Sequence, residues 1–366
     1  MGWSSRAGEI GAGGWLGRSV AVLFVFAIAA ASPARAQRPA PTPTPVPLPN
    51  SEMSATAGLA DLGSNFLERL GDQSTGGFGR AWRSNPGGGG ASEAADGPLY
   101  RTWGEVYGIS TRTGPQLDFV GDRRQTMGGV AGIGARISPG VNVGFSVDQS
   151  RTDIDVPLAM QSATLDLTQL GFNASVDRGP WTGAIALVHG FGNIKSIRDT
   201  GLGNAIAGYT GRIDGALGEV SYFWTRDQGR IVPKAALEFV RASTGAFQEV
   251  GGLNPVAASG AALERSRMLL GAEIGRYWII DQKAVDLSAY GKFVDNFEQS
   301  FSSVTVSSAF QSITVQGIGE SRYGADTGAS ASVGLSNMVR IYLNYDGKFR
   351  AALQSHQGTA GLELRW

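Results

Sequence analysis

From about Tyr100 to Trp366, apolar and polar residues alternate along the chain in one run after another. In residues 141–148, for example, Val, Val, Phe and Val alternate with Asn, Gly, Ser and Asp, and residues 268–275 and 339–346 repeat the pattern. Successive side chains of a β-strand point to opposite faces, so a period of two indicates strands with two unlike faces. Because no amphipathic helix separates the runs, we predict an all-β region over 100–366.

About twelve runs of roughly 10 to 18 residues follow one another, and their connections alternate in length. Short connections carry turn chemistry, as at Ser138–Gly140 and Arg178–Pro180. A transmembrane β-barrel has short turns at one end and long loops at the other, whereas a β-sandwich has no reason to be so polarised. The strands are predicted near 100–111, 124–138, 140–152, 162–178, 180–195, 207–227, 230–245, 261–279, 283–299, 320–337, 338–349 and 356–366, and long loops near 114–123, 153–161, 196–206, 246–260, 299–319 and 349–355.

The first 36 residues have the three parts of a secretory signal peptide. Arg6 and Arg18 precede an apolar run of about 12 residues, which is shorter than the roughly 20 that a membrane-spanning helix needs. Small residues then lead to Ala34-Arg35-Ala36, an A-x-A-type cleavage site. We expect export with cleavage between Ala36 and Gln37; a retained N-terminal anchor is the alternative.

Composition narrows the classes that an exported chain can belong to. There is no cysteine, which excludes disulfide scaffolds, thiolate catalysis and cysteine metal sites. Beyond the predicted signal peptide, 28 basic and 30 acidic residues leave a net charge of −2, without the basic footprint of a nucleic-acid binder. No other apolar run reaches the length of a spanning helix, so the mature chain is expected to have no transmembrane helix. Three classes stay open at this point: a soluble periplasmic protein, a secreted protein and a barrel. Hydropathy does not separate them, because barrel strands alternate apolar and polar residues and average out near neutral.

Glycine and the aromatic residues fit a barrel. Glycine makes up 54 of 366 residues, about twice its usual share of roughly 7%, and a bent, tilted sheet uses glycine for kinks and close backbone approach. Aromatic residues near strand ends are predicted to form interfacial girdles: Trp103, Trp181, Trp224, Tyr277, Trp278, Tyr323 and Tyr345.

Three segments separate the signal peptide from the first strand. Residues 37–50 alternate proline with small residues and predict an extended linker. Residues 51–73 predict a helix, with Gly71 as a plausible end; 74–99 is a Gly-rich loop. The helix has one apolar face, because Leu59, Leu62, Phe66 and Leu70 recur at spacings of three and four.

The last strand has an aromatic terminus and two different faces. Leu362, Leu364 and Trp366 share one face, while Glu363 and Arg365 share the other. Such a strand resembles the recognition strand of bacterial outer-membrane proteins, which in that class is read by the barrel-assembly machinery. We therefore predict that Trp366, Leu364 and Leu362 form an assembly signal.

A series of short motifs runs through the region 100–366 in a fixed order. They are 101–108 (Arg-Thr-Trp-Gly-Glu-Val-Tyr-Gly), 128–134 (Gly-Gly-Val-Ala-Gly-Ile-Gly), 142–146 (Asn-Val-Gly-Phe-Ser), 150–156, 263–267 (Leu-Glu-Arg-Ser-Arg), 270–275 (Leu-Gly-Ala-Glu-Ile-Gly), 342–347 (Tyr-Leu-Asn-Tyr-Asp-Gly) and the final strand. In this order they resemble the C-terminal translocator domain of autotransporter (type V secretion) proteins. The resemblance implies an outer-membrane barrel of about twelve strands with the preceding helix threaded through its pore.

Two departures from the family bear on function. Autotransporters carry a long passenger between signal and barrel, whereas here only about 60 residues lie between Ala36 and the first strand. Self-cleaving members break the chain at an Asn-Asn pair in the helix, and this helix has only Asn65, between Ser64 and Phe66. We therefore expect a short or vestigial passenger and no self-cleavage.

The sequence offers little for catalysis. His189 and His356 are the only histidines, and no G-x-S-x-G elbow, G-x-G-x-x-G or Walker pattern is present. We predict no enzymatic activity, no cofactor and no metal site. Charged residues in phase with the predicted pore face could hold the helix, set ion selectivity or pair with one another: Glu105, Glu219, Glu238, Glu273, Lys292, Arg340, Glu363 and Arg365.

The sequence therefore predicts a translocator-type barrel, for which three functions are possible. The first is passenger export or a passenger-less remnant; the second is a surface adhesin or antigen that uses its long outer loops; the third is a small porin-like channel. The expected partners are outer-membrane lipid throughout, and the Sec translocon and the barrel-assembly machinery during biogenesis. No nucleic acid is expected, and the barrel is expected to be monomeric.

Overall fold

The computed structural model describes residues 47–75, 99–281, 283–308 and 311–366. The predicted signal peptide with its Ala36–Gln37 cleavage site, the linker up to residue 46 and residues 76–98 of the predicted Gly-rich loop lie outside the described residues.

Twelve antiparallel strands close into a barrel, as predicted. Each strand pairs with its neighbours in the chain, and the pairing of β1 with β17 and of β8 with β11 completes the ring. Closure leaves no strand edge facing lipid, where an unpaired backbone amide has no water to bond. The ring comprises β1 (Tyr100–Thr113), β2 (Asp122–Ser138), β3 (Val141–Val156), β4 (Gln161–Arg178), β5 (Trp181–Asp199), β6 (Asn204–Tyr222), β8 (Gly229–Thr244), β11 (Ala262–Ile280), β12 (Lys283–Phe301), β15 (Tyr323–Gly334), β16 (Val339–Arg350) and β17 (Leu353–Arg365).

Every predicted strand corresponds to one of these twelve, but three of the six predicted long loops are wrong. Residues 153–161, 196–206 and 349–355 mostly continue the ladders, so that β3–β4 and β5–β6 are joined by four residues and β16–β17 by two. A short 3-10 turn, η1 (Pro157–Ala159), forms the first of these connections. These strands extend past the apolar part of the wall.

The outer face of the barrel is apolar over the part of the strands next to the short turns and polar towards the opposite end. On β5 the outward residues Trp181, Ile185 and Leu187 are half exposed and are followed by Asn193 and Lys195. An apolar band of this kind is what a barrel presents to lipid. Four of the predicted girdle residues lie on the outer face: Trp181, Trp224, Tyr323 and Tyr345. The prediction for Trp103 is wrong, because its side chain is 3% exposed and lies on the inner face in phase with Glu105.

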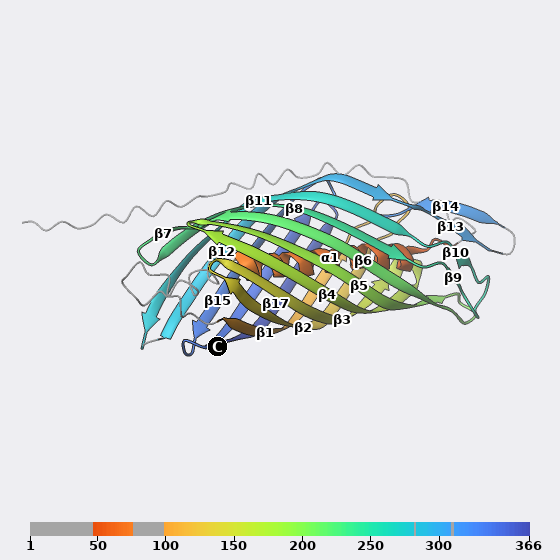
Figure 1. Cartoon of the computed structure of the whole chain (residues 1–366). Coiled ribbons are helices and arrows are strands. Elements are labelled where there is room, and N and C mark those ends of the chain that lie inside the picture. The colour runs from red at the N-terminus through yellow and green to blue at the C-terminus, as the bar shows by residue number, and fades with distance from the viewer. Residues whose placement is uncertain (1–46, 76–98, 282, 309–310) are drawn as a thin grey trace, which may run out of the picture. The chain divides into compact units, whose positions relative to one another are not determined.

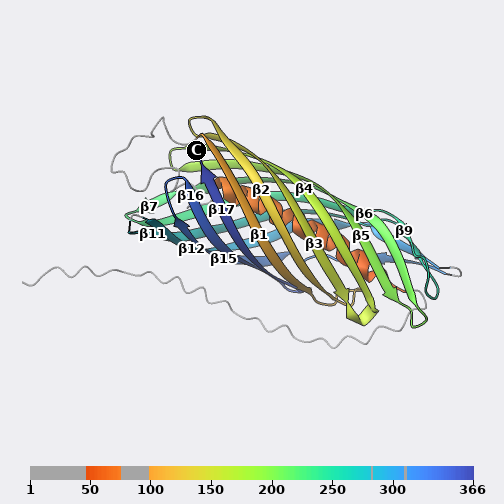
Figure 2. The ribbon, with the colours of Figure 1, turned by 90° about the horizontal axis from the view of Figure 1, so that it is seen from below.

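Helix α1 (Asn50–Thr75) lies inside the barrel, as both Figure 1 and Figure 2 show. It packs mainly against β4, β5, β6 and β8. The predicted apolar face is there: Leu59, Leu62, Phe66 and Leu70 are at most 5% exposed and join a cluster with wall residues such as Ile213. The helix starts one residue before the predicted segment and continues through Gly71, which was expected to end it. No helix within the described residues is long and apolar enough to span a membrane.

Glycines let the helix come close to the wall. A Cβ added at Gly63 or Gly71 of α1 would lie 2.7 Å from Ile213 Cγ2 and 2.8 Å from Leu217 Cδ2, respectively. On β6, a Cβ at Gly215 would lie 2.8 Å from Leu67 Cδ1, while one at Gly211 would lie 2.6 Å from Leu59 Cδ1. Gly71 therefore serves close packing rather than helix termination.

The two longest loops, between β8 and β11 and between β12 and β15, fold into a small sheet at one end of the barrel. Its strand order is β14 (Ser312–Gln316), β13 (Ser303–Ser307), β10 (Ala257–Ala258) and β9 (Phe247–Gln248). Val304, Val306 and Val315 on this sheet form an apolar cluster with Phe119 from the β1–β2 loop and with Met53 from α1. We call this sheet the cap; it covers the end of the lumen where the helix begins. At the other end, a three-residue extension, β7 (Trp224–Arg226), pairs with β8.

We expect a charged substitution to destabilise the barrel when it lies in the apolar band of the outer face, and to have little effect in the polar part of that face. Ile185→Arg should destabilise the folded barrel by about 2–4 kcal/mol, because it places a cation in hydrocarbon. Asn193→Arg, on the same strand and face but in the polar part, should cost only about 0–1 kcal/mol. Urea unfolding in lipid vesicles measures both, and equal effects would contradict the assigned band.

Candidate functional site

The site with the most chemistry is the lumen, where the polar face of α1 meets charged side chains of the wall. The structure places all eight predicted pore residues on the inner face, with side chains mostly covered by α1 or by one another. Four of them contact α1 directly: Glu105, Glu219, Glu238 and Lys292. The other four pair along the wall: Arg230 Nη2 lies 2.8 Å from Glu273 Oε1, and Arg340 Nη2 lies 2.8 Å from Glu363 Oε2. The other carboxylate oxygen of Glu363, Oε1, lies 2.6 Å from Arg365 Nε.

Glu68 is the centre of the largest helix-to-wall contact. Its carboxylate lies 2.7 Å from Arg267 Nη2 on β11, 3.2 Å from Lys292 Nζ on β12 and 2.6 Å from Lys348 Nζ on β16. Arg267 is also paired with Glu238 at 2.7 Å. Three strands that are distant from α1 in the sequence thus converge on one helix carboxylate, and rotating the helix would separate all three pairs.

Arg69, the next residue, points to a different part of the wall. Its Nε lies 2.8 Å from Glu105 Oε2 on β1, and its Nη1 lies 3.4 Å from Asp148 Oδ2 on β3. The guanidinium also lies 4.3 Å from the centre of the Tyr107 ring, whose hydroxyl donates to Asp148 at 2.9 Å. Adjacent opposite charges on α1 therefore face opposite charges on two sectors of the barrel.

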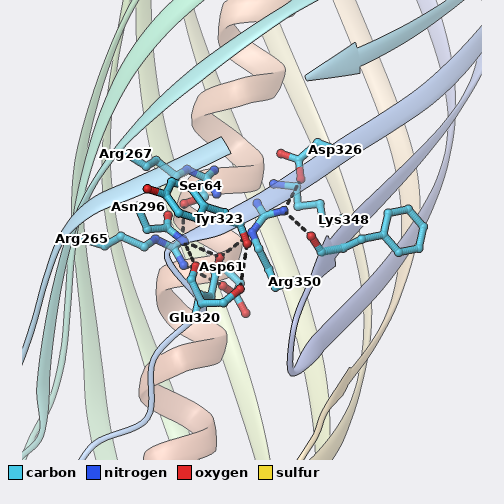
Figure 3. Close-up of polar contacts among 12 residues, drawn as sticks. Asp61, Ser64, Arg265, Arg267, Asn296, Glu320, Tyr323, Asp326, Lys348 and Arg350 are labelled. Atoms are coloured by element: carbon cyan, nitrogen blue, oxygen red, sulfur yellow. Dashed lines mark hydrogen bonds and ion pairs between the residues drawn. The ribbon is translucent and has the colours of Figure 1, made fainter. Parts of the chain in front are cut away.

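Nearer the cap, Asp61 connects α1 to a second network (Figure 3). Its carboxylate lies 2.9 Å from Arg124 Nη1 and 3.3 Å from Arg265 Nη1. Arg265 also bonds Glu320, from the loop before β15, and Arg350 Nε lies 2.9 Å from the same Glu320 carboxylate. A residue of the long loop thus enters the barrel beside the helix and ties the loop to the wall.

A polar cavity remains on the side of α1 away from β5. It measures about 160 Å³, which holds roughly five waters at about 30 Å³ each. Asn65, Glu68 and Arg69 of α1 line it together with wall residues such as Lys234 and Tyr342. Charges of both signs therefore line this cavity.

At the cap end, Glu52 is fully buried in the first turn of α1, above the apolar band. Thr244, at the end of β8, donates to its Oε1 at 3.2 Å, while its Oε2 has no hydrogen-bond partner among the described residues. Burial raises the pKa of Glu52 to about 8, an effect that the Thr244 hydrogen bond partly opposes. This end of the helix thus holds a carboxyl that favours its neutral form.

Sequence reasoning found the wall's inward positions but missed the charges that hold the helix. Arg265 and Arg267 are in phase with the predicted Glu273 on β11, and Lys348 is in phase with Arg340 on β16. The alternation along these two strands would therefore have identified Arg265, Arg267 and Lys348 as inward-facing residues. Glu320 is different: it was assigned to a strand, and nothing in the sequence shows that its loop returns into the lumen.

The two histidines lie on the outer face and far apart in the ring. His189 Nδ1 on β5 lies 2.8 Å from Asp214 Oδ1, and His356 on β17 bonds the Tyr345 hydroxyl at 2.7 Å. Across the described ranges, no group of three or more His, Asp or Glu side chains is arranged to hold a metal ion.

A closed twelve-strand ring with a helix in its lumen can be compared with known proteins. A family model described as the autotransporter β-domain matches residues 102–346, more than half of the chain. The chain belongs to the autotransporter β-domain family. It is therefore a translocator-type barrel of the bacterial outer membrane, and translocator domains of this family are typically not catalytic.

Solved structures agree on the fold. The chain is similar to the translocator domain of the autotransporter NalP from Neisseria meningitidis, with a TM-score of 0.67 and 14% identity over 87% of this chain and 100% of that one. It is also similar to the β-domain of the Bordetella autotransporter BrkA, with a TM-score of 0.54 and 14% identity over 73% of this chain and 99% of that one. A search of curated protein sequences finds no match.

Removing the Glu68 charge should loosen the helix more than removing a more exposed one. Glu68→Gln leaves Lys292 and Lys348 buried without their carboxylate and should cost about 3–5 kcal/mol. Asp72→Asn, on the same helix, removes a carboxylate that is 43% exposed and pairs with Lys234. Lys234 keeps a second carboxylate, Glu219, at 3.8 Å, so this change should cost only about 0–1 kcal/mol. Unfolding free energies and the rate of protease cleavage within α1 report both changes. A larger effect of the Asp72 variant would refute the central role of Glu68.

A rise of pH from about 4.5 to about 8 should loosen the cap end of α1. The Glu52 carboxyl ionises near pH 4.5 when exposed and near pH 8 when docked. Between these values only the undocked form loses its proton, so docking weakens as pH rises through this window and changes no further above it. Proteolysis near Asn50, followed from pH 4 to pH 9, should accelerate with pH in the native chain and stay flat in Glu52→Gln.

Proposed function

We propose that this barrel exports the segment that precedes α1 and then retains the helix as a plug. The observation that carries the proposal is the direction of the helix. Its Asn50 end lies under the cap, where Leu48 packs against the cap cluster and the Leu48 carbonyl accepts a hydrogen bond from Gln161 at 2.7 Å. Its other end lies by the first strand, where Arg101 donates to the Gln73 carbonyl at 3.0 Å. The chain therefore crosses the barrel once through the lumen.

The different loop lengths at the two ends of the barrel indicate the direction in which the chain crosses the membrane. In outer-membrane barrels the short turns face the periplasm and the long loops face the outside. The cap is made of the two long loops, so it marks the outer end, and everything before Pro47 is proposed to lie at the cell surface. The predicted signal peptide, with cleavage between Ala36 and Gln37, would leave a short proline-rich passenger. Because the helix has no Asn-Asn pair, we propose that this passenger stays attached.

Biogenesis partners follow from the same proposal. Delivery through the Sec translocon would use the predicted signal peptide. The barrel-assembly machinery would read the last strand, whose Leu362, Leu364 and Trp366 side chains lie on the outer face and are about 40–56% exposed. Trp366 stacks on Tyr100 of β1 at 6.3 Å between ring centres, next to the point where the first and last strands meet.

Export to the surface can be tested with an epitope inserted after Thr42. We expect antibody to label it on intact cells, because the chain would pass through the pore before reaching this point. The control is the same epitope after Gln228, in the short turn before β8, which should be labelled only after the outer membrane is permeabilised. Labelling of the Thr42 site only after permeabilisation would overturn the proposal.

Conductance separates the plug from a porin-like channel. The native barrel in a planar bilayer should conduct poorly, because α1 lies in the lumen and is held there by charged wall residues. Deletion of residues 37–75 should raise the conductance, whereas high conductance of the native barrel would support the channel and contradict the plug. The cap, built from the loops around 246–260 and 299–319, is the observation that favours an adhesive role as a second function.

A further inference from the structure

The outermost strand of the cap has an open edge. β14 pairs with β13 along its whole length, from Ser303↔Gln316 to Ser307↔Ser312, with no bulge. On its other side β14 meets no strand among the described residues. Figures 1 and 2 both show this hairpin extending past the ends of the barrel strands, so its edge is not hidden by the barrel.

This edge has none of the devices that natural proteins use to keep edges from pairing. Exposed edge strands usually carry a lysine or other charge, a proline or a bulge. Here no charged residue and no proline occur from Ser300 to Gly319, a stretch rich in Val, Ile, Thr, Ser and Gln. High β-propensity without charge is the composition that favours strand addition.

The hydrogen-bond pattern shows which amides the edge offers. Ser308 donates to the Gln311 carbonyl at 2.8 Å, so this pair is a bonded one. Bonded and non-bonded pairs alternate in an antiparallel ladder. The backbone groups of Ser312, Thr314 and Gln316 therefore point away from β13, while those of Ile313 and Val315 point toward it.

We propose that β14 pairs with β14 of a second copy of this chain. The strand is complementary to itself in antiparallel register about Thr314, which places Thr314 opposite Thr314, Ile313 opposite Val315 and Ser312 opposite Gln316. The apolar Ile313 and Val315 then stay on one face and the polar residues on the other, as in the hairpin itself. The absence of charge means that two identical edges meet without repulsion.

The geometry points to partners in facing membranes. The hairpin extends outward from the barrel, and antiparallel pairing reverses the direction of the second hairpin. The barrel of the second copy then lies on the far side of the contact, in another membrane. This homotypic contact needs only that the cap faces outward; it does not require that the barrel exports a passenger.

A single cysteine tests the register, because the chain has no other. In the proposed pairing Thr314 is a bonded pair across the two-fold axis, with its Cα atoms about 5.5 Å apart, within the span of about 4.4–6.8 Å that a disulfide bridges. Thr314→Cys should form disulfide-linked dimers under mild oxidation when two populations of vesicles carrying the full chain are mixed. Thr305→Cys, exposed on the same face of β13, would be separated from its copy by three strand spacings of about 4.8 Å each, and should form at least about tenfold less dimer.

Two substitutions test the edge without disturbing the hairpin. Thr314→Pro removes an amide that points away from β13, where proline is tolerated at a strand edge, and Thr314→Lys adds a charge that repels its copy. Both should abolish clustering of vesicles or cells, while Thr314→Val should preserve it. The folded barrel of every variant is checked by its heat-dependent migration on gels. Equal cross-linking at 314 and 305 would overturn the proposal. Clustering that survives both Thr314→Pro and Thr314→Lys in folded barrels would overturn it as well. Cross-links formed only within one vesicle population would overturn the facing-membrane arrangement.

Discussion

The lumen of a twelve-strand ring is too wide for the inward side chains alone to fill, and the rest of this structure depends on how it is filled. Eight strands already enclose a space that side chains just occupy. Here α1 lies in the lumen, and the wall is shaped for it on one side by glycines such as Gly211 and Gly215. The glycine-rich composition therefore reflects a helix packed against a sheet as much as a bent sheet.

The helix meets two different surfaces, and each contributes something different. Its apolar face packs against β4, β5, β6 and β8, where burial of Leu59, Phe66 and Leu70 supplies most of the attraction. Its polar face is held by Asp61, Glu68 and Arg69. Buried ion pairs add little net stability compared with apolar packing, but removing one partner is costly. We interpret these pairs as fixing the depth and rotation of the helix rather than as the source of its binding energy.

The cap extends this arrangement beyond the membrane. Met53 of α1 and Phe119 of the β1–β2 loop belong to the same apolar cluster as the cap strands, and Glu320 anchors the second long loop inside the barrel. The cap is thus tied both to the plug and to the wall. A rigid support of this kind holds the β13–β14 hairpin in place while leaving its outer edge free for another chain.

Alternation and turn chemistry in the sequence determined the twelve strands, their inner and outer faces and the helix, because these depend on local backbone geometry and on which side of each strand is apolar. The same alternation places Trp103 inward, because it lies two residues before Glu105; its prediction as a girdle residue went by residue type and was wrong. The tertiary structure alone decided two further features. Residues 153–161 and 196–206 mostly continue strands because paired neighbours extend past the membrane. The partners of Glu68 come from three strands, and Glu320 from a returning loop, since contacts between residues far apart in the chain exist only once the ring has closed.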